Sequence, residues 1–235
     1  MIKFLKKILF LIFIAAIIVG GFFVYQGYDL YKKAIAETSI DDKIEKIKTE
    51  NENYVKFEDL PEEYINAIVA VEDRRFYIHN GVDLISIARA VITDIKTMSL
   101  AEGGSTITQQ LAKNTYFTQR KEVTRKIAEI FMAFEYEKVC TKEEILELYV
   151  NTIYFGDGYY CIYDAAKGYF DKEAKDMDMY ECTLIAGIPN APSVYAPTKN
   201  PELAKQRQAQ VLLKMIDCNY ITKEEANRVL EINRF

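Results

Sequence analysis

The sequence has no excess of basic residues. It contains 30 lysines and arginines against 35 aspartates and glutamates, which gives a formal net charge of -5. Proteins that bind the nucleic-acid backbone broadly need a basic field over their surface. The charge therefore argues against nucleic acid as a partner, and any anionic ligand must be bound by a local group of cations.

Cysteines with metal-binding spacing are also absent. The four cysteines lie far apart in the chain, at Cys140, Cys161, Cys182 and Cys218. Zinc sites use closely spaced pairs of cysteines, and no such pair occurs here. Two interpretations of these residues stay open, because an external domain could oxidise them to disulfides and buried free thiols fit equally well.

Strand signals are scarce, whereas helix starts are well marked. Few segments alternate polar and apolar residues, and there is no internal repeat. Pro61 is followed by two glutamates, which is typical of the first turn of a helix. Thr141 and Thr222 each have a glutamate three residues later, as in a capping box. The sequence therefore predicts an all-α or mainly α-helical body.

One long apolar run occupies the N-terminus. No charged residue occurs from Ile8 to Val24, and about 20 apolar residues are enough to cross a bilayer. The lysines that precede the run favour a cytoplasmic N-terminus and an external body. The alternative is a cleaved signal peptide, but the run is longer than a usual signal and no small-residue cleavage site follows. Residues 1–27 are predicted to be a cytoplasmic tip and a transmembrane anchor.

The next segment, residues 28–53, is polar and contains neither proline nor a strong apolar stripe. Such a composition predicts a stalk or a loosely packed helical connection. The folded domain is predicted to cover residues 54–235.

A glutamate continues an apolar stripe in the helix that begins at Pro61. Ile65, Ile68 and Val69 share one face of this helix, and Glu72 takes the next position on that face. Burial without a neighbouring cation raises the pKa of a carboxyl group, which suits it to proton transfer near neutral pH. A helix-end glutamate exposed to solvent is the alternative.

A glycine pair at Gly103 opens a run of hydroxyl and amide side chains that extends to Asn114. Such groups can bind sugar or phosphate oxygens, and Lys113 supplies a compact positive charge. The alternative is an ordinary helix start, with Ser105 or Thr106 as the cap and a solvated lysine.

A third cluster follows at Arg125 and Glu129, which are four residues apart and share one face of a predicted helix. Ile127, Ile130 and Phe134 form the apolar stripe of the same helix. The alternative is a surface ion pair without a function.

Taken together, these segments resemble five signatures of the bacterial peptidoglycan glycosyltransferases, in the order in which that family has them. The matching ranges are 72–83, 103–114, 125–129, 142–151 and 165–197. The resemblance covers nearly the whole body from Tyr54 onward. It implies an all-α, lysozyme-like large lobe and a smaller jaw near the membrane, formed or bordered by residues 98–124.

The resemblance also implies a reaction. Lipid II, a disaccharide-peptide on a polyprenyl pyrophosphate, would be polymerised into β-1,4 glycan strands with inversion, and Glu72 would be the general base. Glu129 could orient Arg125 or Lys113, or hold a divalent metal, Mg or Mn, on the pyrophosphate. No organic cofactor is implied.

Further roles follow from the same resemblance. Lys113, Arg125 and Arg89 would bind the pyrophosphate; Ser105, Gln109, Gln110 and Asn114 would line the donor side; Arg75 and Phe76 would shape the acceptor side. His79 and Asp83 would support the end of their helix, and Tyr149 and Asn151 would brace the groove. Cys161 is a departure, because the family commonly has glycine there.

The implied location is the bacterial cytoplasmic membrane, with one span and an external catalytic domain. Expected partners are lipid II, the growing glycan strand, the bilayer, and transpeptidases or other cell-wall synthesis proteins. No transpeptidase domain follows Phe235, which resembles the monofunctional branch of the family. Two alternatives stay open: a lytic enzyme that cleaves glycan strands, which would need no pyrophosphate site, and a non-catalytic cell-wall scaffold.

Overall fold

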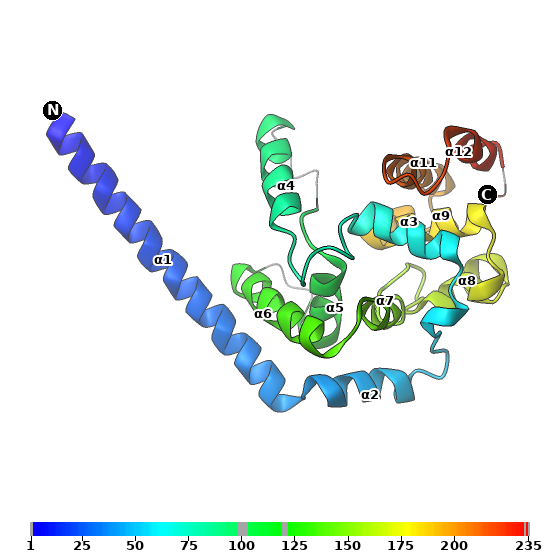
Figure 1. Ribbon diagram of the computed structural model, residues 1–235, viewed down its shortest axis with the longest axis horizontal. Coiled ribbons are helices and arrows are strands. Elements are labelled where there is room, and N and C mark those ends of the chain that lie inside the picture. Colours follow the sequence, from blue (N-terminus) through cyan, green and yellow to red (C-terminus); the bar gives the residue numbers. More distant parts are fainter. Residues whose placement is uncertain (1, 98–102, 119–121, 233, 235) are drawn as a thin grey trace.

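The structure, a computed structural model, describes residues 2–97, 103–118, 122–232 and 234. Only helices, turns and irregular segments occur in these ranges, so the predicted all-α fold is confirmed (Figure 1). The α-helices are α1 (Ile2–Glu37), α2 (Ile40–Glu50), α3 (Glu62–Glu72), α4 (Leu84–Thr97), α5 (Ile107–Tyr116), α6 (Val123–Val139), α7 (Lys142–Val150), α8 (Ile162–Phe170), α9 (Met179–Gly187), α10 (Pro192–Tyr195), α11 (Pro201–Asp217) and α12 (Lys223–Leu230). Short 3-10 helices are η1 (Phe57–Asp59), η2 (Ala174–Asp176) and η3 (Ile188–Asn190).

Helix α1 has the length and composition of a membrane span. A window of 18 residues within Phe4–Glu37 has a mean hydropathy of 2.8 and no buried residues. In Figure 1 the N-terminal half of α1 extends well away from the body. The helix therefore presents its apolar side chains outward, as a lipid-facing helix does.

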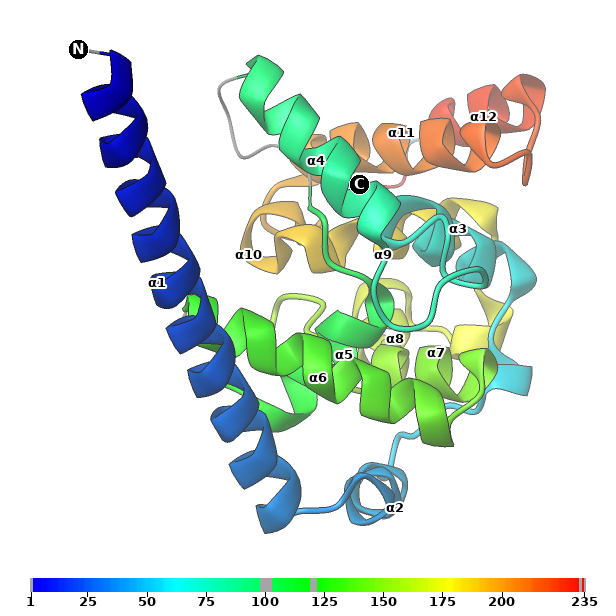
Figure 2. The same ribbon diagram turned by 60° about the vertical axis from the view of Figure 1, so that its left-hand side comes forward.

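The C-terminal part of α1 packs against α6 (Figure 2). The ring of Tyr31 stacks on Phe131 with centroids 5.7 Å apart, and its hydroxyl donates to Glu135 Oε1 at 2.9 Å. Tyr31 and Ile40 are buried in the same core as the rest of the body. Residues 28–53 are thus mostly helical, and the body covers the side chains of Tyr31 and Ile40.

Gly27 allows this close approach. A Cβ atom at Gly27 would lie 2.5 Å from Ile127 Cγ2 and 3.0 Å from the Thr124 carbonyl oxygen. Gly27→Leu is therefore expected to separate α1 from α6 and to reduce stability by about 1–3 kcal/mol. Thermal unfolding in detergent would measure this loss. Gly20→Leu is the matched control, since nothing lies within 4 Å there; an equal Tm for both variants would contradict the packing argument.

Two groups of helices build the body. Helices α3, α9 and α11 pack on one another, and α5 packs on both α6 and α7. The predicted helix starts are confirmed, because Thr141 and Thr222 each form a complete capping box and Pro61 is the N-cap of α3. All four cysteines are free thiols, and Cys161 caps α8.

Candidate active site

Glu72 is the last residue of α3, and its side chain is only 8% exposed. Its Oε2 atom accepts a hydrogen bond from Gln110 Nε2 at 2.7 Å. Oε1 has no hydrogen-bond partner among the described residues, and Arg207 Nη2 lies 3.9 Å from it. One carboxylate oxygen is thus held in place, whereas the other is available to receive a proton.

Burial raises the pKa of Glu72, although the bond from Gln110 and the charges of Arg207 and Lys113 oppose this effect. The low exposure of the side chain confirms the predicted burial of Glu72. Desolvation of a carboxylate with an unpaired oxygen is the physical cause, because the charged form loses more than the neutral form on leaving water.

A group of cations surrounds the second glutamate. Glu129 is 1% exposed and accepts from both Arg125 Nη1 and Lys126 Nζ, the latter at 2.9 Å. Lys126 Nζ also donates to Ser105 Oγ at 2.6 Å. Lys113 lies within electrostatic range of this group: burial lowers its pKa, Glu129 opposes the change, and Arg125 and Lys126 reinforce it. Three cations, Arg125, Lys126 and Lys113, thus lie near the single carboxylate of Glu129. The resulting positive charge favours an anionic ligand.

Two of the predicted site residues, Phe76 and Gln109, are buried. Phe76 is fully buried, and Lys142 Nζ lies 4.6 Å from its ring centroid. The core covers the ring, so Phe76 has no exposed face for an acceptor, and its role in shaping the acceptor side stays a prediction. Gln109 is also buried, and its Oε1 accepts from Thr106 N at 3.0 Å in the capping box of α5. The side chain of Gln109 therefore serves the helix start.

The predicted site residues Arg75, Arg89 and Asn114 are only partly buried. Arg75 Nε lies 3.1 Å from Asp83 Oδ2. Arg89 lies on α4 and donates to Ser86 Oγ at 3.3 Å. Asn114 is half-buried on α5. Residues 98–102 and 119–121 of the predicted jaw lie outside the described residues.

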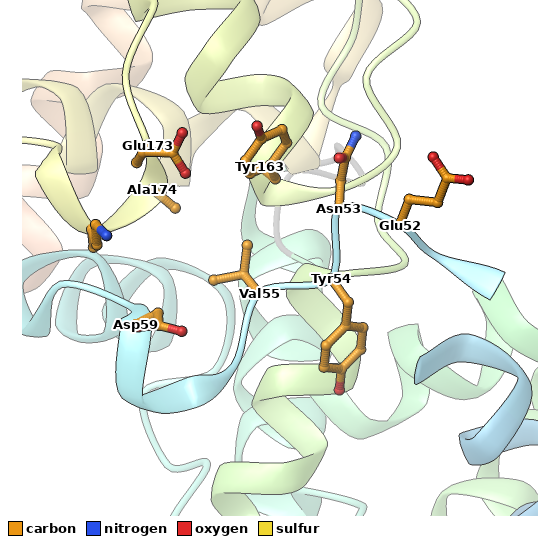
Figure 3. Close-up of a pocket in the computed structure, with 9 residues that line it drawn as sticks. Glu52, Asn53, Tyr54, Val55, Asp59, Tyr163, Glu173 and Ala174 are labelled. Atoms are coloured by element: carbon orange, nitrogen blue, oxygen red, sulfur yellow. The ribbon is translucent and has the colours of Figure 1, made fainter. Parts of the chain in front are cut away.

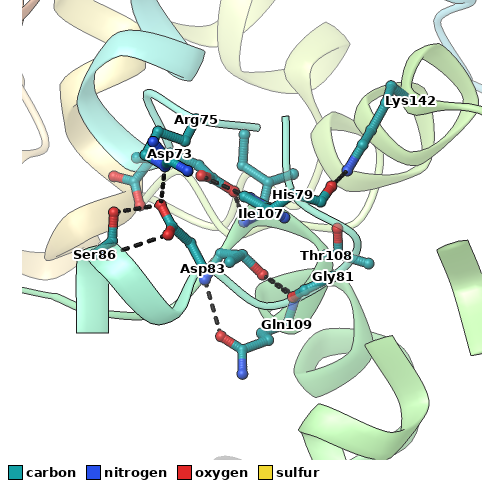
Figure 4. A network of polar contacts seen from close by, with 12 residues as sticks. Asp73, Arg75, His79, Gly81, Asp83, Ser86, Ile107, Thr108, Gln109 and Lys142 are labelled. Carbon is teal, nitrogen blue, oxygen red and sulfur yellow. Dashed lines mark hydrogen bonds and ion pairs between the residues drawn. The ribbon is translucent and has the colours of Figure 1, made fainter. Parts of the chain in front are cut away.

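A buried network ties the end of α3 to the start of α5 (Figure 4). The Asp73 carboxylate is hydrogen-bonded to His79 Nε2 at 2.9 Å and accepts from Ile107 N at 3.0 Å. Lys142 Nζ donates to the His79 carbonyl at 2.7 Å. His79 thus has the structural role that was predicted, and the network holds Glu72 beside α5.

Arg207 is a site residue that sequence reasoning missed. It lies on α11, far from Glu72 in the sequence, and its guanidinium is also 5.8 Å from the Tyr195 ring centroid. No local pattern distinguishes this arginine from the other basic residues of its helix. Only the packing of α11 on α3 brings it to the carboxylate.

The donor set does not fit a preformed metal site. No group of three or more His, Cys, Asp or Glu side chains that could hold an ion occurs in the part of the chain that the structure describes. Both oxygens of Glu129 already accept from cations. A divalent metal would have to displace Arg125 or Lys126, so no step is assigned to it, and the metal stays a prediction.

A separate cavity of about 240 Å³ lies between the segment before η1 and the region of α8 and η2 (Figure 3). It is lined by Glu52, Asn53, Tyr54, Val55, Asp59, Tyr163, Glu173, Ala174 and Lys175. None of these residues contributes to the group around Glu72.

Comparison with known proteins shows which family the chain belongs to. Residues 40–216 match the family described as Transglycosylase. The chain is 42% identical over 178 residues to a Cupriavidus necator protein named as a transglycosylase, covering 76% of this chain and 77% of that protein. It is 43% identical over 185 residues to penicillin-binding protein 1F of Bacillus subtilis, covering 79% of this chain and 26% of that protein.

Among solved structures, penicillin-binding protein 1A from Haemophilus influenzae matches with a TM-score of 0.48 and 25% identity, covering 77% of this chain and 18% of that chain. The chain thus spans about a quarter or less of these two penicillin-binding proteins. The chain belongs to the transglycosylase family, whose domain is the peptidoglycan glycosyltransferase domain of class A penicillin-binding proteins.

Proposed function

We propose that this peptidoglycan glycosyltransferase polymerises lipid II into β-1,4 glycan strands by inverting transfer, with Glu72 as the general base. The observation that carries the proposal is that a buried carboxylate and a group of cations lie near each other. A buried carboxylate with one unpaired oxygen lies within electrostatic range of Lys113, which belongs to the cation group around Glu129. Proton removal and pyrophosphate departure need these two environments side by side.

In the proposed step, the 4-hydroxyl oxygen of the acceptor sugar forms a bond to the anomeric carbon of the donor. The bond from that carbon to the pyrophosphate breaks, and its electron pair leaves with the phosphate. Oε1 of Glu72 takes the hydroxyl proton. Attack from the face opposite the pyrophosphate converts an α-linked donor into a β-linked product.

The leaving pyrophosphate gains negative charge, which nearby cations stabilise. Lys113, Arg125 and Lys126 are the groups that we assign to this task. Ser105 takes part indirectly, because its hydroxyl accepts from Lys126. A lytic enzyme would have no use for this cation group.

The proposed setting is the bacterial cytoplasmic membrane, with the N-terminus inside and the catalytic domain on the external face. Exposed apolar side chains on α4, at Leu84, Ile85 and Ile92, support a second contact with lipid. Figure 1 shows α4 extending from the body on the same side as the N-terminal end of α1. Transpeptidases and other wall-synthesis proteins are the proposed protein partners.

The test is incubation of detergent-solubilised protein with labelled lipid II, followed by a gel that resolves glycan length. Lengthened strands support the proposal. Shortened or anhydro-ended strands, formed when preassembled glycan is supplied, would identify a lytic enzyme instead. A folded protein that leaves both substrates unchanged would identify a scaffold.

The pH dependence of the rate is expected to report on Glu72. The base acts only when it is deprotonated, so kcat/KM falls on the acid side as Glu72 takes up a proton, and burial places this fall above the ordinary pKa of glutamate. Arg207→Gln removes a charge that lowers the pKa of Glu72. We expect its acid limb to move to higher pH.

A pH-rate profile on lipid II measures the limb. Lys214→Gln is the matched control, because it makes the same charge change at an exposed position of α11. Equal limbs in wild type and Arg207→Gln would exclude this electrostatic role.

A further inference from the structure

Tyr149 connects to the proposed base through one intermediate side chain. It lies on α7, is fully buried, and donates from its hydroxyl to Gln110 Oε1 at 3.2 Å. Gln110 Nε2 in turn donates to Glu72 Oε2 at 2.7 Å. Two consecutive hydrogen bonds thus link α7, α5 and α3 and end at the carboxylate.

The direction of these bonds matters because a carboxamide has one accepting end and one donating end. If the amide of Gln110 were reversed, its oxygen would face the carboxylate of Glu72 and repel it. Because the Tyr149 hydroxyl donates to Gln110 Oε1, it favours the orientation in which the amide nitrogen of Gln110 faces Glu72. Burial also raises the pKa of Tyr149 well above its ordinary value, so the phenol remains protonated.

Simple packing does not account for this hydroxyl. Tyr64 is an equally buried tyrosine, near enough for the charge of Glu72 to raise its pKa, and its hydroxyl has no hydrogen-bond partner among the described residues. The surroundings of Glu72 therefore tolerate a buried hydroxyl that makes no bond. The bond of Tyr149 to Gln110 is a specific arrangement.

We infer that Tyr149 is a positioning residue for the base, which holds the Gln110 amide in the orientation that fixes Glu72 Oε2 and leaves Oε1 for the acceptor proton. This inference rests on the proposed function of Glu72. Other charged or titratable groups that act on Glu72 are Arg207 from α11, Lys113 from α5, and Tyr64 and Asp73 from α3 and its end. A change limited to the hydroxyl of Tyr149 leaves all of them in place.

Tyr149→Phe is the direct test, since it removes one oxygen atom. We expect kcat to fall about tenfold, as loss of one buried hydrogen bond allows, while KM stays within about twofold. The acid limb of the pH-rate profile should move to higher pH, because a less well oriented amide stabilises the carboxylate less.

Two further variants separate positioning from general stability. On a Gln110→Ala background, Tyr149→Phe should cause no additional loss of kcat, because the intermediate side chain is already gone. Tyr136→Phe is the matched control: Tyr136 is equally buried, and its hydroxyl is hydrogen-bonded to Thr115 Oγ1 at 2.9 Å. That control should leave kcat and the acid limb unchanged.

The titration of Glu72 can also be followed without turnover, by infrared spectroscopy of glutamate-labelled protein against the Glu72→Gln variant. Tyr149→Phe is expected to raise the pKa of Glu72 in this measurement. An unchanged titration, or equal losses of kcat on the wild-type and Gln110→Ala backgrounds, would overturn the inference. Wild-type protein that makes no polymer would overturn the proposed function, whereas the titration would still decide the role of Tyr149.

Discussion

Glu72→Gln is expected to reduce glycan polymerisation by about three orders of magnitude, within the range that a general base supplies. Glutamine keeps the shape of the side chain and cannot accept the acceptor proton. The rate of strand formation from lipid II, read from a gel that resolves glycan length, measures the effect. Glu63→Gln is the matched control, because it makes the same change at an exposed position of α3.

Folding of the Glu72→Gln variant should not explain its inactivity. The pKa of Glu72 is raised in the folded state, so this carboxyl stabilises the fold when protonated, and that contribution is lost as the pH rises through the folded pKa. At neutral pH a neutral glutamine avoids the desolvated charge. The Tm of the variant should therefore equal or exceed that of wild type. A Glu72→Gln protein that still polymerises lipid II would refute the assignment of Glu72 as the general base.

Lys113→Met is expected to lower kcat/KM by about two to three orders of magnitude, comparable to the loss of one preorganised group that stabilises an oxyanion. Methionine has a similar length but no charge to offer the departing pyrophosphate. Because burial already disfavours the charge of Lys113, the folded protein should tolerate methionine well. Steady-state kinetics on lipid II and a Tm measurement together test both statements.

Lys113→Arg distinguishes charge from shape, since arginine keeps the charge on a planar group that is always protonated. Partial recovery of kcat/KM relative to Lys113→Met would indicate that charge dominates. Lys46→Met is the control for loss of an exposed lysine, because Lys46 lies on α2 in a surface ion pair with Glu50. A Lys113→Met protein as active as this control would remove Lys113 from the pyrophosphate site.

Local patterns in the sequence predicted three helix starts, at Pro61, Thr141 and Thr222, and placed Glu72 on the apolar face of its helix. Capping at Thr141 depends on residues within one turn, and the apolar stripe that ends at Glu72 depends on residues within three turns. These patterns involve residues that are close together in the chain, so they can be recognised without knowing the fold. The same is true of the grouping of Arg125 with Glu129, which one helical turn brings together.

Contacts across the fold could not be predicted in this way. No local pattern indicated that Gln110 donates to Glu72 or that the buried ring of Phe76 lies beside Lys142 Nζ. Helical position restricts where a side chain can point, but the neighbouring helix decides what it meets.

The sequence by itself therefore determined an all-α chain with an apolar N-terminal helix, the residues of the signatures, and a buried glutamate. Only the tertiary structure decided that Arg207 approaches one oxygen of Glu72 and that Gln110, backed by Tyr149, holds the other. The physical reason is distance along the chain: helix packing brings together α3, α5, α7 and α11, and no local propensity encodes which side chains then meet.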